Sequence, residues 1–299
     1  MKKLLAIGPL FIMIAALLWS LDGLLRVSLF SLPPTVIVFW EHLLGALVLL
    51  PIIFFKRKEI AKLTRKEWGA LGIIGLFSGV LGTVMYTAAL GKVQFIQFSV
   101  VVLLQQLQPI WAISAAAILL KEKLNKNFIY WAILGVTSTY LISFKDLRVH
   151  LDSSNQTLIA ALLALGAGFV WAVSTSFSKI VLNKISFELT TLLRFLITPV
   201  FAILFVFGLG NQGALFALDQ GQWVRLLLIV FSTGMVALLI YYYGLRKTPA
   251  RVSSITELVW PASAIFIDYF HFGNSLSGTQ ILGIVILAVS IYKVSQYKK

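Results

Sequence analysis

The sequence of 299 residues contains no cysteine and only three histidines. Without thiols the chain can form no disulfide, no iron–sulfur cluster and no thiolate zinc site, and its redox compartment stays undetermined. The catalytic signatures G-x-S-x-G, the P-loop and H-E-x-x-H are also absent, and the histidines lie in distant segments. These absences argue against an enzyme, and we expect neither a cofactor nor a metal site.

Charged residues are scarce over long stretches of the chain. Hydrophobic residues make up 59% of it, against roughly 45–50% in soluble domains. A bilayer-spanning helix needs about 18 or more residues with few or no charges. Windows that reach this length without a charge are 4–21, 68–91, 93–120, 127–144, 153–178 and 195–218. The sequence therefore predicts an all-α integral membrane protein in a lipid bilayer.

The chain has 25 basic and 11 acidic residues and a net charge of +14. These charges lie in short segments between apolar windows, so we expect them to set the topology and expect no nucleic-acid partner. If both termini face the cytoplasm, 19 of the 25 basic residues fall on the inner side, as the positive-inside rule requires. We expect a multi-pass protein of the cell (inner) membrane with cytoplasmic N- and C-termini. The basic segment 56–68 is interpreted as a topology signal, and an amphipathic segment on the inner leaflet is the alternative.

Charged, proline-rich and glycine-rich breaks divide the chain into ten predicted transmembrane helices. Their approximate ranges are 5–29, 35–55, 68–90, 97–120, 127–144, 157–181, 187–208, 222–245, 252–272 and 277–295. Lys2 and Lys3 precede the first apolar run, as in a signal peptide, but no clear small-residue cleavage site follows. We therefore expect a retained first helix.

The two halves of the chain repeat one pattern. Residue pairs separated by 152 positions are Trp19 and Trp171, His42 and Arg194, Pro109 and Pro261, Leu124 and Leu276, and Tyr140 and Tyr292. Tyr86 and Tyr241, and Leu90 and Leu245, are separated by 155 positions, which implies a three-residue insertion near 94–96. The halves 1–150 and 151–299 then hold five helices each. Because five is odd, the second half enters the membrane from the opposite side, and we expect two inverted five-helix repeats.

Ionisable residues within the predicted helices are few. Each costs about 2.5–3.5 kcal/mol at the bilayer centre, so those present are functional candidates. Asp22 and Arg26 lie one turn apart and can pair; a structural ion pair and a role facing the substrate are both open. Glu41 and His42 point about 100° apart on the second helix. Glu41 could carry a proton or neutralise Arg26 or His42, and Arg194 occupies the position that matches His42.

Gln105 and Gln108 lie one turn apart on the fourth predicted helix. Pro109 has no amide hydrogen, so the carbonyl of Gln105 loses its helical partner. In the second half, Pro261 frees the carbonyl of Glu257 in the same way. We expect a helix kink at each proline and, because polar side chains recur at matched positions, a binding cavity. Ordinary hydrogen bonding between helices is the alternative.

Glu257, Asp268 and His271 share one stripe of the ninth predicted helix. The stripe resembles an ion or substrate path, although Asp268 and His271 by themselves fit a solvated helix end better. Aromatic residues expected to line the cavity are Trp19, Tyr86, Trp171, the run from Tyr241 to Tyr243, and Trp260. Packing or anchoring at the membrane interface is the alternative for each of them.

The order and spacing of these features resemble the drug/metabolite transporter superfamily, in particular its EamA-type members. The residues concerned are Trp19, Tyr86, Leu90, Pro109 and the K-E-K-L segment 121–124, and in the second half Trp171, Arg194, Tyr241, Leu245, Pro261 and Leu276. Two departures are His42, where the family often has arginine, and Asn274, which stands where the first half has Glu122. The resemblance implies a ten-helix secondary transporter that moves amino acids, nucleosides, sugars or other metabolites, often outward, through a cavity between the repeats.

We therefore expect a monomeric secondary transporter, an exporter, that works by alternating access and has protons as its candidate coupling ion. Gln105, Gln108, Arg194 and Glu257 are the expected polar contacts of a small-molecule substrate, with the matched tryptophans as apolar walls. Arg194 suits a carboxylate and Glu257 an amine, so an amino acid or similar zwitterion is the favoured substrate. A passive channel is the main alternative, and a membrane scaffold or enzyme is a weaker one.

Overall fold

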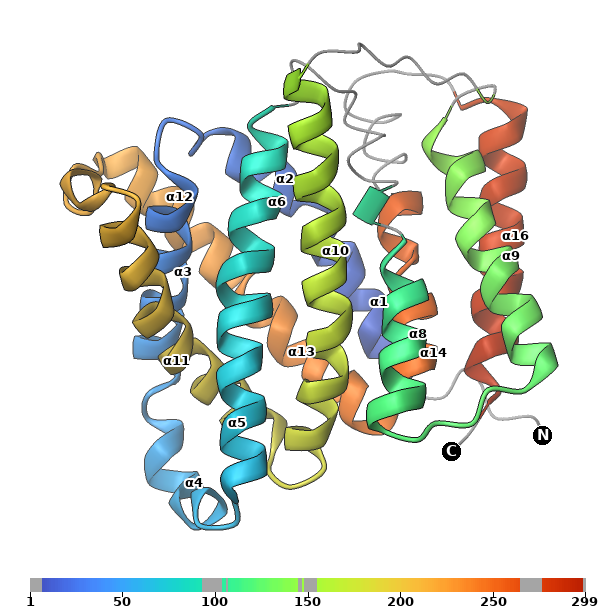
Figure 1. Ribbon diagram of the computed structural model, residues 1–299, viewed down its shortest axis with the longest axis horizontal. Helices are drawn as coiled ribbons and strands as arrows, with labels where there is room; N and C mark the ends of the chain where they lie inside the picture. The colour runs from blue at the N-terminus through green and yellow to red at the C-terminus, as the bar shows by residue number, and fades with distance from the viewer. Residues whose placement is uncertain are drawn as a thin grey trace.

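The computed structural model describes residues 7–92, 104–105, 107–144, 147, 155–263 and 276–297. Within these ranges the regular structure is helical and contains no strand. Most of the helices run alongside one another and form a bundle (Figure 1). The all-helical fold agrees with the prediction from the sequence.

The helices of the first half are α1 (Ile7–Ser20), α2 (Asp22–Val27), α3 (Pro34–Leu49), α4 (Ile52–Ile60), α5 (Arg65–Ile74), the π-helix η1 (Gly75–Gly82), α6 (Thr83–Leu90), α8 (Gln108–Leu119) and α9 (Lys126–Ser143). Those of the second half are α10 (Asn155–Leu182), α11 (Phe187–Gly208), the 3₁₀-helix η3 (Gln212–Ala214), α12 (Gln220–Phe231), α13 (Met235–Lys247), α14 (Ala250–Thr256) and α16 (Gly278–Ser295). Consecutive elements join into longer helical stretches in three places: α1 with α2, α5 with η1 and α6, and α12 with α13.

Six helical stretches in the described residues are long and apolar enough to cross a membrane. They are Ile7–Arg26, Arg65–Leu90, Leu158–Leu182, Phe187–Gly208, Gln220–Lys247 and Gly278–Ser295. Helices α3 and α4 form a further pair, but they meet at 90°, so the helix expected over 35–55 ends early. Pro51 lies at this bend. Because proline has no amide hydrogen, it cannot continue the hydrogen bonding of α3. A multi-pass membrane fold fits these helices, and the count of ten crossings stays a prediction.

Polar capping residues fix several helix starts. The side chain of Thr64 and that of Glu67 cap each other's backbone at the start of α5, and Asp219 and Gln222 do the same at α12. Asn125 accepts a hydrogen bond from a backbone amide in the first turn of α9. Such caps stabilise a helix by about 0.5–2 kcal/mol because they satisfy amides that have no partner within the helix.

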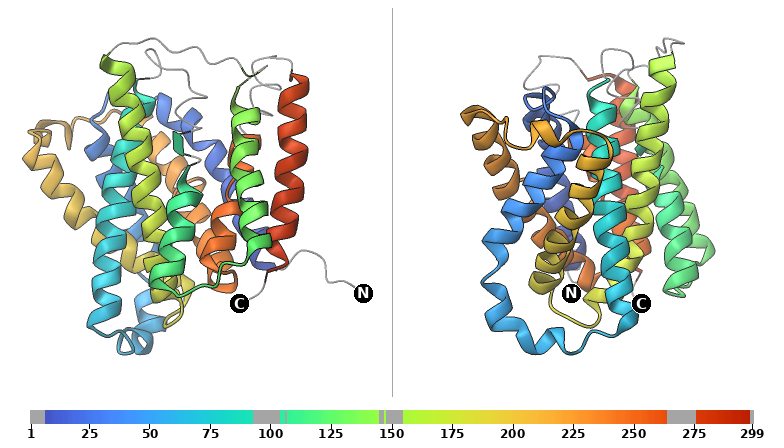
Figure 2. Two further views of the ribbon diagram at one scale, coloured as in Figure 1. Left: turned by 45° about the vertical axis from the view of Figure 1, so that its right-hand side comes forward. Right: turned by 60° about the vertical axis from the view of Figure 1, so that its left-hand side comes forward.

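Helices of the two halves alternate in the bundle. Helix α3 packs against α11, α9 against α16, and α1 against α13. Helix α10 in turn packs against α5, η1 and α6, and α8 packs against both α10 and α14 (Figure 2). The first helix of each half thus contacts the third helical stretch of the other half.

Small residues allow the first and third helices to approach closely. A Cβ atom added at Gly244 of α13 would lie 2.7 Å from the carbonyl oxygen of Gly8 in α1. At the matching crossing of α10 with α6, Ala160 and Ala89 are both fully buried in one cluster. Larger side chains at these four positions would force the helices apart.

The outer surface is apolar, whereas much of the interior is polar. Phe54 is 78% exposed and Phe216 is 83% exposed, while Thr190, Ser253 and Thr256 are fully buried. A soluble protein rarely exposes large apolar patches. This distribution fits a protein whose surrounding solvent is lipid.

One end of the bundle gathers the basic connections. Helix α4, the connections that follow α8 and α10, and the end of α16 all lie at the lower end of the view (Figure 1). These segments include Lys56, Arg57, Lys121, Lys184 and Lys293. This end of the molecule therefore carries many basic side chains.

Candidate functional site

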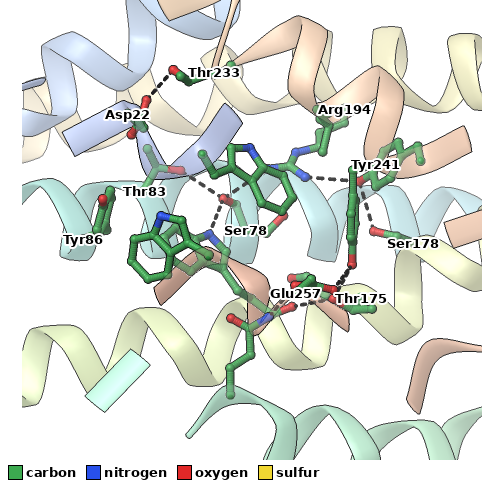
Figure 3. Close-up of a pocket in the computed structure, with 18 of the residues that line it drawn as sticks. Asp22, Ser78, Thr83, Tyr86, Thr175, Ser178, Arg194, Thr233, Tyr241 and Glu257 are labelled. Carbon is green, nitrogen blue, oxygen red and sulfur yellow. Dashed lines mark hydrogen bonds between the residues drawn. The ribbon is translucent and has the colours of Figure 1, made fainter. Parts of the chain in front are cut away.

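A cavity of about 180 Å³ lies between helices of both halves. The nine residues expected to contact a substrate all line it: Trp19, Tyr86, Gln105, Gln108, Trp171, Arg194, Tyr241, Glu257 and Trp260. Of the residues considered for coupling or ion pairing, Asp22, Arg26, Glu41 and His42 line it as well. Asp268, together with Ala264 and His271 of the same stripe, lies outside the described residues. The structure thus brings residues from both halves to one site (Figure 3).

A buried ion cluster forms one wall of the cavity. Arg26 contacts Asp22, and its Nη2 donates to Glu41 Oε2 at 2.8 Å. Thr233 Oγ1 donates to the other oxygen of Asp22 at 2.6 Å. The side chains of the three charged residues are at most 8% exposed. Glu41 therefore neutralises Arg26, one of the two roles that the sequence left open for Glu41. Both side chains line the cavity.

His42 and its repeat-matched partner Arg194 both line the cavity. The carbonyl of Val38 can only accept, so Nδ1 of His42 donates to it, at 2.9 Å. The imidazole ring lies 4.8 Å from the ring of Phe195, centroid to centroid. These contacts fix the His42 ring, and no carboxylate of the described residues lies at ion-pair distance from it.

Glu257 accepts three hydrogen bonds from uncharged groups. Its Oε1 receives the hydroxyls of Tyr241 at 2.8 Å and Ser253 at 3.0 Å, and its Oε2 receives Gln108 Nε2 at 3.1 Å. Within the described ranges no cation lies at ion-pair distance from this carboxyl group. A carboxyl group in such surroundings can take up a proton without breaking a salt bridge.

Gln105, the residue that matches Glu257 in the first half, is different. It is only 2% exposed, yet neither Oε1 nor Nε2 of its carboxamide has a hydrogen-bond partner among the residues that the structure describes. Its backbone packs against α10 at Gly168, where an added Cβ atom would lie 3.2 Å from the Gln105 carbonyl oxygen. A larger residue at Gly168 would displace Gln105.

The expected proline kinks take the form of helix breaks. The α-helical hydrogen-bonding pattern is interrupted at Leu107, where the backbone keeps helical angles, and it resumes with α8, whose first turn contains Pro109. It is interrupted again at 257–258, where Glu257 also keeps helical angles, and residues 259–263, which include Pro261, are helical. Proline is well tolerated in a first turn, because the amide that it lacks would have no partner there. Pro109 lines the cavity.

Two aromatic pairs form opposite parts of the cavity wall. The ring centroids of Trp19 and Tyr241 lie 5.1 Å apart, and those of Trp171 and Tyr86 lie 5.5 Å apart. Trp260 extends the second pair, with its ring 6.4 Å from that of Tyr86. Each pair joins a first helix to the third helical stretch of the other half, so residues that match in the repeat make matching contacts.

The main-chain oxygen of Ser78 is a site component that the sequence analysis missed. It accepts from Trp171 Nε1 at 3.2 Å and from Thr83 Oγ1 at 3.1 Å, and Arg194 Nη2 lies at 3.4 Å. Ser78 belongs to η1, and π-helical turns free carbonyls from the regular ladder. Three glycines within the segment GLFSGVLG are the sequence signal that could have indicated an irregular helix here.

Small hydroxyl-bearing residues were missed as well. Additional lining residues are Ser174, Thr175, Ser178, Thr233 and Ser254, and Tyr242 of the predicted aromatic run 241–243 lines the cavity as well. Ser178 and Arg194 Nη1 both contact the hydroxyl of Tyr242, at 3.0 Å and 3.2 Å. Two of the missed residues lie 152 positions after residues that the sequence did single out: Ser174 matches Asp22, and Ser178 matches Arg26. Applying the spacing of 152 to the ion cluster would have found them.

The chain resembles known transporters over almost its whole length. The EamA-like transporter family matches residues 6–144 and again residues 158–296. The riboflavin transporter ImpX of Fusobacterium nucleatum is 37% identical over 292 residues, which cover 97% of each chain. An uncharacterized transporter of Clostridium kluyveri is 25% identical over 318 aligned positions, which cover all of this chain and 95% of its own.

A solved crystal structure of another protein has the same fold. It superposes with a TM-score of 0.69 at 17% sequence identity, and covers 95% of this chain and 94% of its own. At this identity the likeness bears on the fold alone. The protein's family is shown by the two matches to the family model and by the relatives that align over the full length. The chain belongs to the EamA-like transporter family and is a transporter, not an enzyme.

Proposed function

We propose that the protein is a secondary active transporter for a flat, uncharged aromatic metabolite of the riboflavin type. The observation that carries the proposal is the pair of aromatic walls, Trp19 with Tyr241 and Trp171 with Tyr86. Contacts between aromatic rings contribute about 0.5–1.5 kcal/mol each beyond their buried area. The full-length similarity to a riboflavin transporter supports the same substrate class.

The polar groups of the cavity suit a substrate with a ring and a hydroxylated chain. Ser174, Thr175 and Ser178 lie on consecutive turns of α10 and line the cavity with hydroxyls. Such groups donate to and accept from alcohols equally well. The aromatic walls would hold the ring, and these hydroxyls would hold the chain.

The charge of the cavity favours a neutral substrate. Among the described lining residues, two cations, Arg26 and Arg194, stand against three carboxyl groups, those of Asp22, Glu41 and Glu257. Arg26 is already paired with two of these. A phosphorylated flavin would therefore meet more negative than positive charge.

An amino acid, the substrate favoured by the sequence, is the competing candidate. It would need Arg194 for its carboxylate and Glu257 for its amine. Arg194 already contacts Tyr242 and the Ser78 carbonyl, and Glu257 accepts three internal hydrogen bonds. A zwitterion would have to break these contacts, so we place it second.

The proposed mechanism is alternating access by two inverted five-helix repeats, 1–150 and 151–299, in a monomer with ten crossings. The packing of each first helix against the third stretch of the other half supports this arrangement. The matched aromatic pairs support it as well. We propose the cell membrane as the location and cytoplasmic termini, because the basic connections lie at one end with the end of α16.

Protons are the proposed coupling ion, and Glu257 is the proposed site. Glu41, the other candidate, is held by Arg26 at 2.8 Å, so protonating it would leave a buried cation with one partner fewer. Glu257 contacts no cation in the described part of the chain. The outward direction expected from the family resemblance is part of the proposal, and flux measured both ways tests it.

The test is counterflow in liposomes that contain the purified protein. Vesicles are loaded with riboflavin, and uptake of labelled riboflavin is followed with and without a proton gradient of either sign. Flavin mononucleotide, amino acids and nucleosides serve as competitors. We expect saturable exchange of riboflavin, weak competition by its phosphorylated form, and stimulation by the gradient.

Three results would count against parts of the proposal. Saturable exchange of amino acids without exchange of riboflavin would make the substrate class wrong. Flux that neither saturates nor shows counterflow would favour the channel alternative. Equal competition by riboflavin and its phosphate would contradict the charge argument.

A further inference from the structure

Gln105 lines the cavity, and its carboxamide donor and acceptor have no hydrogen-bond partner among the residues that the structure describes. Both atoms of the carboxamide are buried. A buried polar group without a partner costs about 1–3 kcal/mol. A single group that satisfies both atoms must offer an acceptor next to a donor, because a carboxamide carries N–H and C=O side by side.

The matched residue shows what a satisfied position looks like. Glu257 in the second half is saturated by Tyr241, Ser253 and Gln108. In the first half, position 101, which matches Ser253, is a valine, and Trp260 matches Gln108. Two of the three partners of Glu257 are thus replaced in the first half, and Gln105 has no hydrogen-bond partner in the described ranges.

The chain neighbour of Gln105 packs with the second aromatic pair. Leu104, next to Gln105 in the chain, packs in one cluster with Tyr86, Trp171 and Trp260. The indole N–H of Trp260 is also buried without a partner in the described ranges. A ring that stacks on this wall with its edge turned toward Gln105 and Trp260 would meet two donors and one acceptor.

Such a combination recognises planar rings in other settings. A glutamine or asparagine carboxamide pairs with the donor–acceptor edge of adenine through two hydrogen bonds. An imide edge, in which one N–H lies between two carbonyls, is complementary to the donors of Gln105 and Trp260 and to the acceptor of Gln105. The pyrimidine-like ring of a flavin has this edge.

We infer that Gln105 is the specificity-determining residue of the cavity and selects substrates whose aromatic ring carries an imide edge, by pairing its carboxamide with the ring N–H and a neighbouring carbonyl. This inference rests on the proposed function, since it names the feature of the substrate that the cavity reads. It adds a requirement that aromatic stacking alone would not impose.

The experiment compares riboflavin with N3-methylriboflavin, in which the imide N–H is replaced by a methyl group. Binding to the purified protein in detergent is followed by quenching of flavin fluorescence. For the wild-type protein we expect methylation to weaken binding about tenfold or more, the effect of leaving a buried polar group unpaired. In Gln105→Leu the two ligands should bind with similar affinity, because the group that distinguishes them is gone.

Gln108→Leu is the matched control. It removes the same side chain one turn further along, where the carboxamide is already engaged by Glu257. Whatever it does to overall affinity, it should preserve the preference for riboflavin over its methyl derivative. A loss of the preference in both variants would contradict a special role for Gln105.

The wild-type comparison needs no variant and so remains decisive if a variant does not fold. Equal binding of the two flavins would overturn the inference and leave the proposed function standing. If the folded protein binds no riboflavin, the proposed function fails, and uridine against 3-methyluridine tests the imide requirement separately. Failure to bind either ring would overturn the inference too.

Discussion

Replacing Arg26 by methionine should destabilise the protein more than any other single change in the ion cluster. The guanidinium contacts Asp22 and Glu41, and all three side chains are at most 8% exposed. Its removal leaves two buried carboxylates with no cation in contact within the described residues. Breaking one buried pair costs about 3–5 kcal/mol, so we expect a loss at the upper end of this range or beyond it.

Glu41→Gln is the informative comparison. Arg26 keeps Asp22 in this variant, and the amide oxygen of glutamine can still accept from Nη2. The loss should therefore be no more than that of one hydrogen bond to a charged group, about 1.5–3 kcal/mol. The double variant should be more stable than Arg26→Met alone, because neutralising Glu41 removes one of the two carboxylates left without a cation.

The assay is chemical unfolding of the detergent-solubilised protein, followed by tryptophan fluorescence. The wild type, the two single variants and the double variant are measured side by side. The coupling free energy between the two sites is the quantity of interest. If the double variant loses the sum of the two single losses, or if Arg26→Met is as stable as the wild type, the cluster does not act as described. Thr198→Val, a buried change away from the cluster, provides a baseline.

Three further predictions concern coupling and packing. Glu257→Gln should keep counterflow but abolish stimulation by a proton gradient, whereas Glu41→Gln should retain stimulation; the opposite pattern would reassign the proton site. Gly168→Val should weaken riboflavin binding about tenfold with a modest loss of stability, because its side chain meets the Gln105 backbone, and equilibrium binding measures this. Gly244→Val should cost about 1–3 kcal/mol or more in unfolding experiments, since its Cβ would lie 2.7 Å from Gly8; unchanged stability would contradict the tight crossing.

The cavity-lining residues could be found from the sequence because polar and aromatic groups have few places in a lipid-embedded helix. The repeat spacing paired Trp19 with Trp171 and Tyr86 with Tyr241, and all four line the cavity. Spacing within a helix also placed Asp22 beside Arg26. These inferences need only the helical period and the cost of polar groups in lipid.

Contacts between helices could not be found in this way. Whether Glu41 would meet Arg26 or His42 depends on how two helices are rotated about their axes, and the sequence left both open. The role of the Ser78 carbonyl is invisible because every residue has a carbonyl, and only the local π-helix frees this one. The early end of α3 at Leu49 was missed because residues 52–55 are as apolar as a membrane span.

The close crossings of α1 with α13 and of α10 with α6 bear on how such a molecule can move. Gly8 faces Gly244 at one crossing, and Ala89 and Ala160 are buried at the other. Interlocked long side chains must change rotamer before two helices can roll over each other, whereas backbones separated only by hydrogen or methyl groups meet no such obstacle. In the alternating access proposed above, these two crossings, each of which joins helices of both halves, would serve as the pivots.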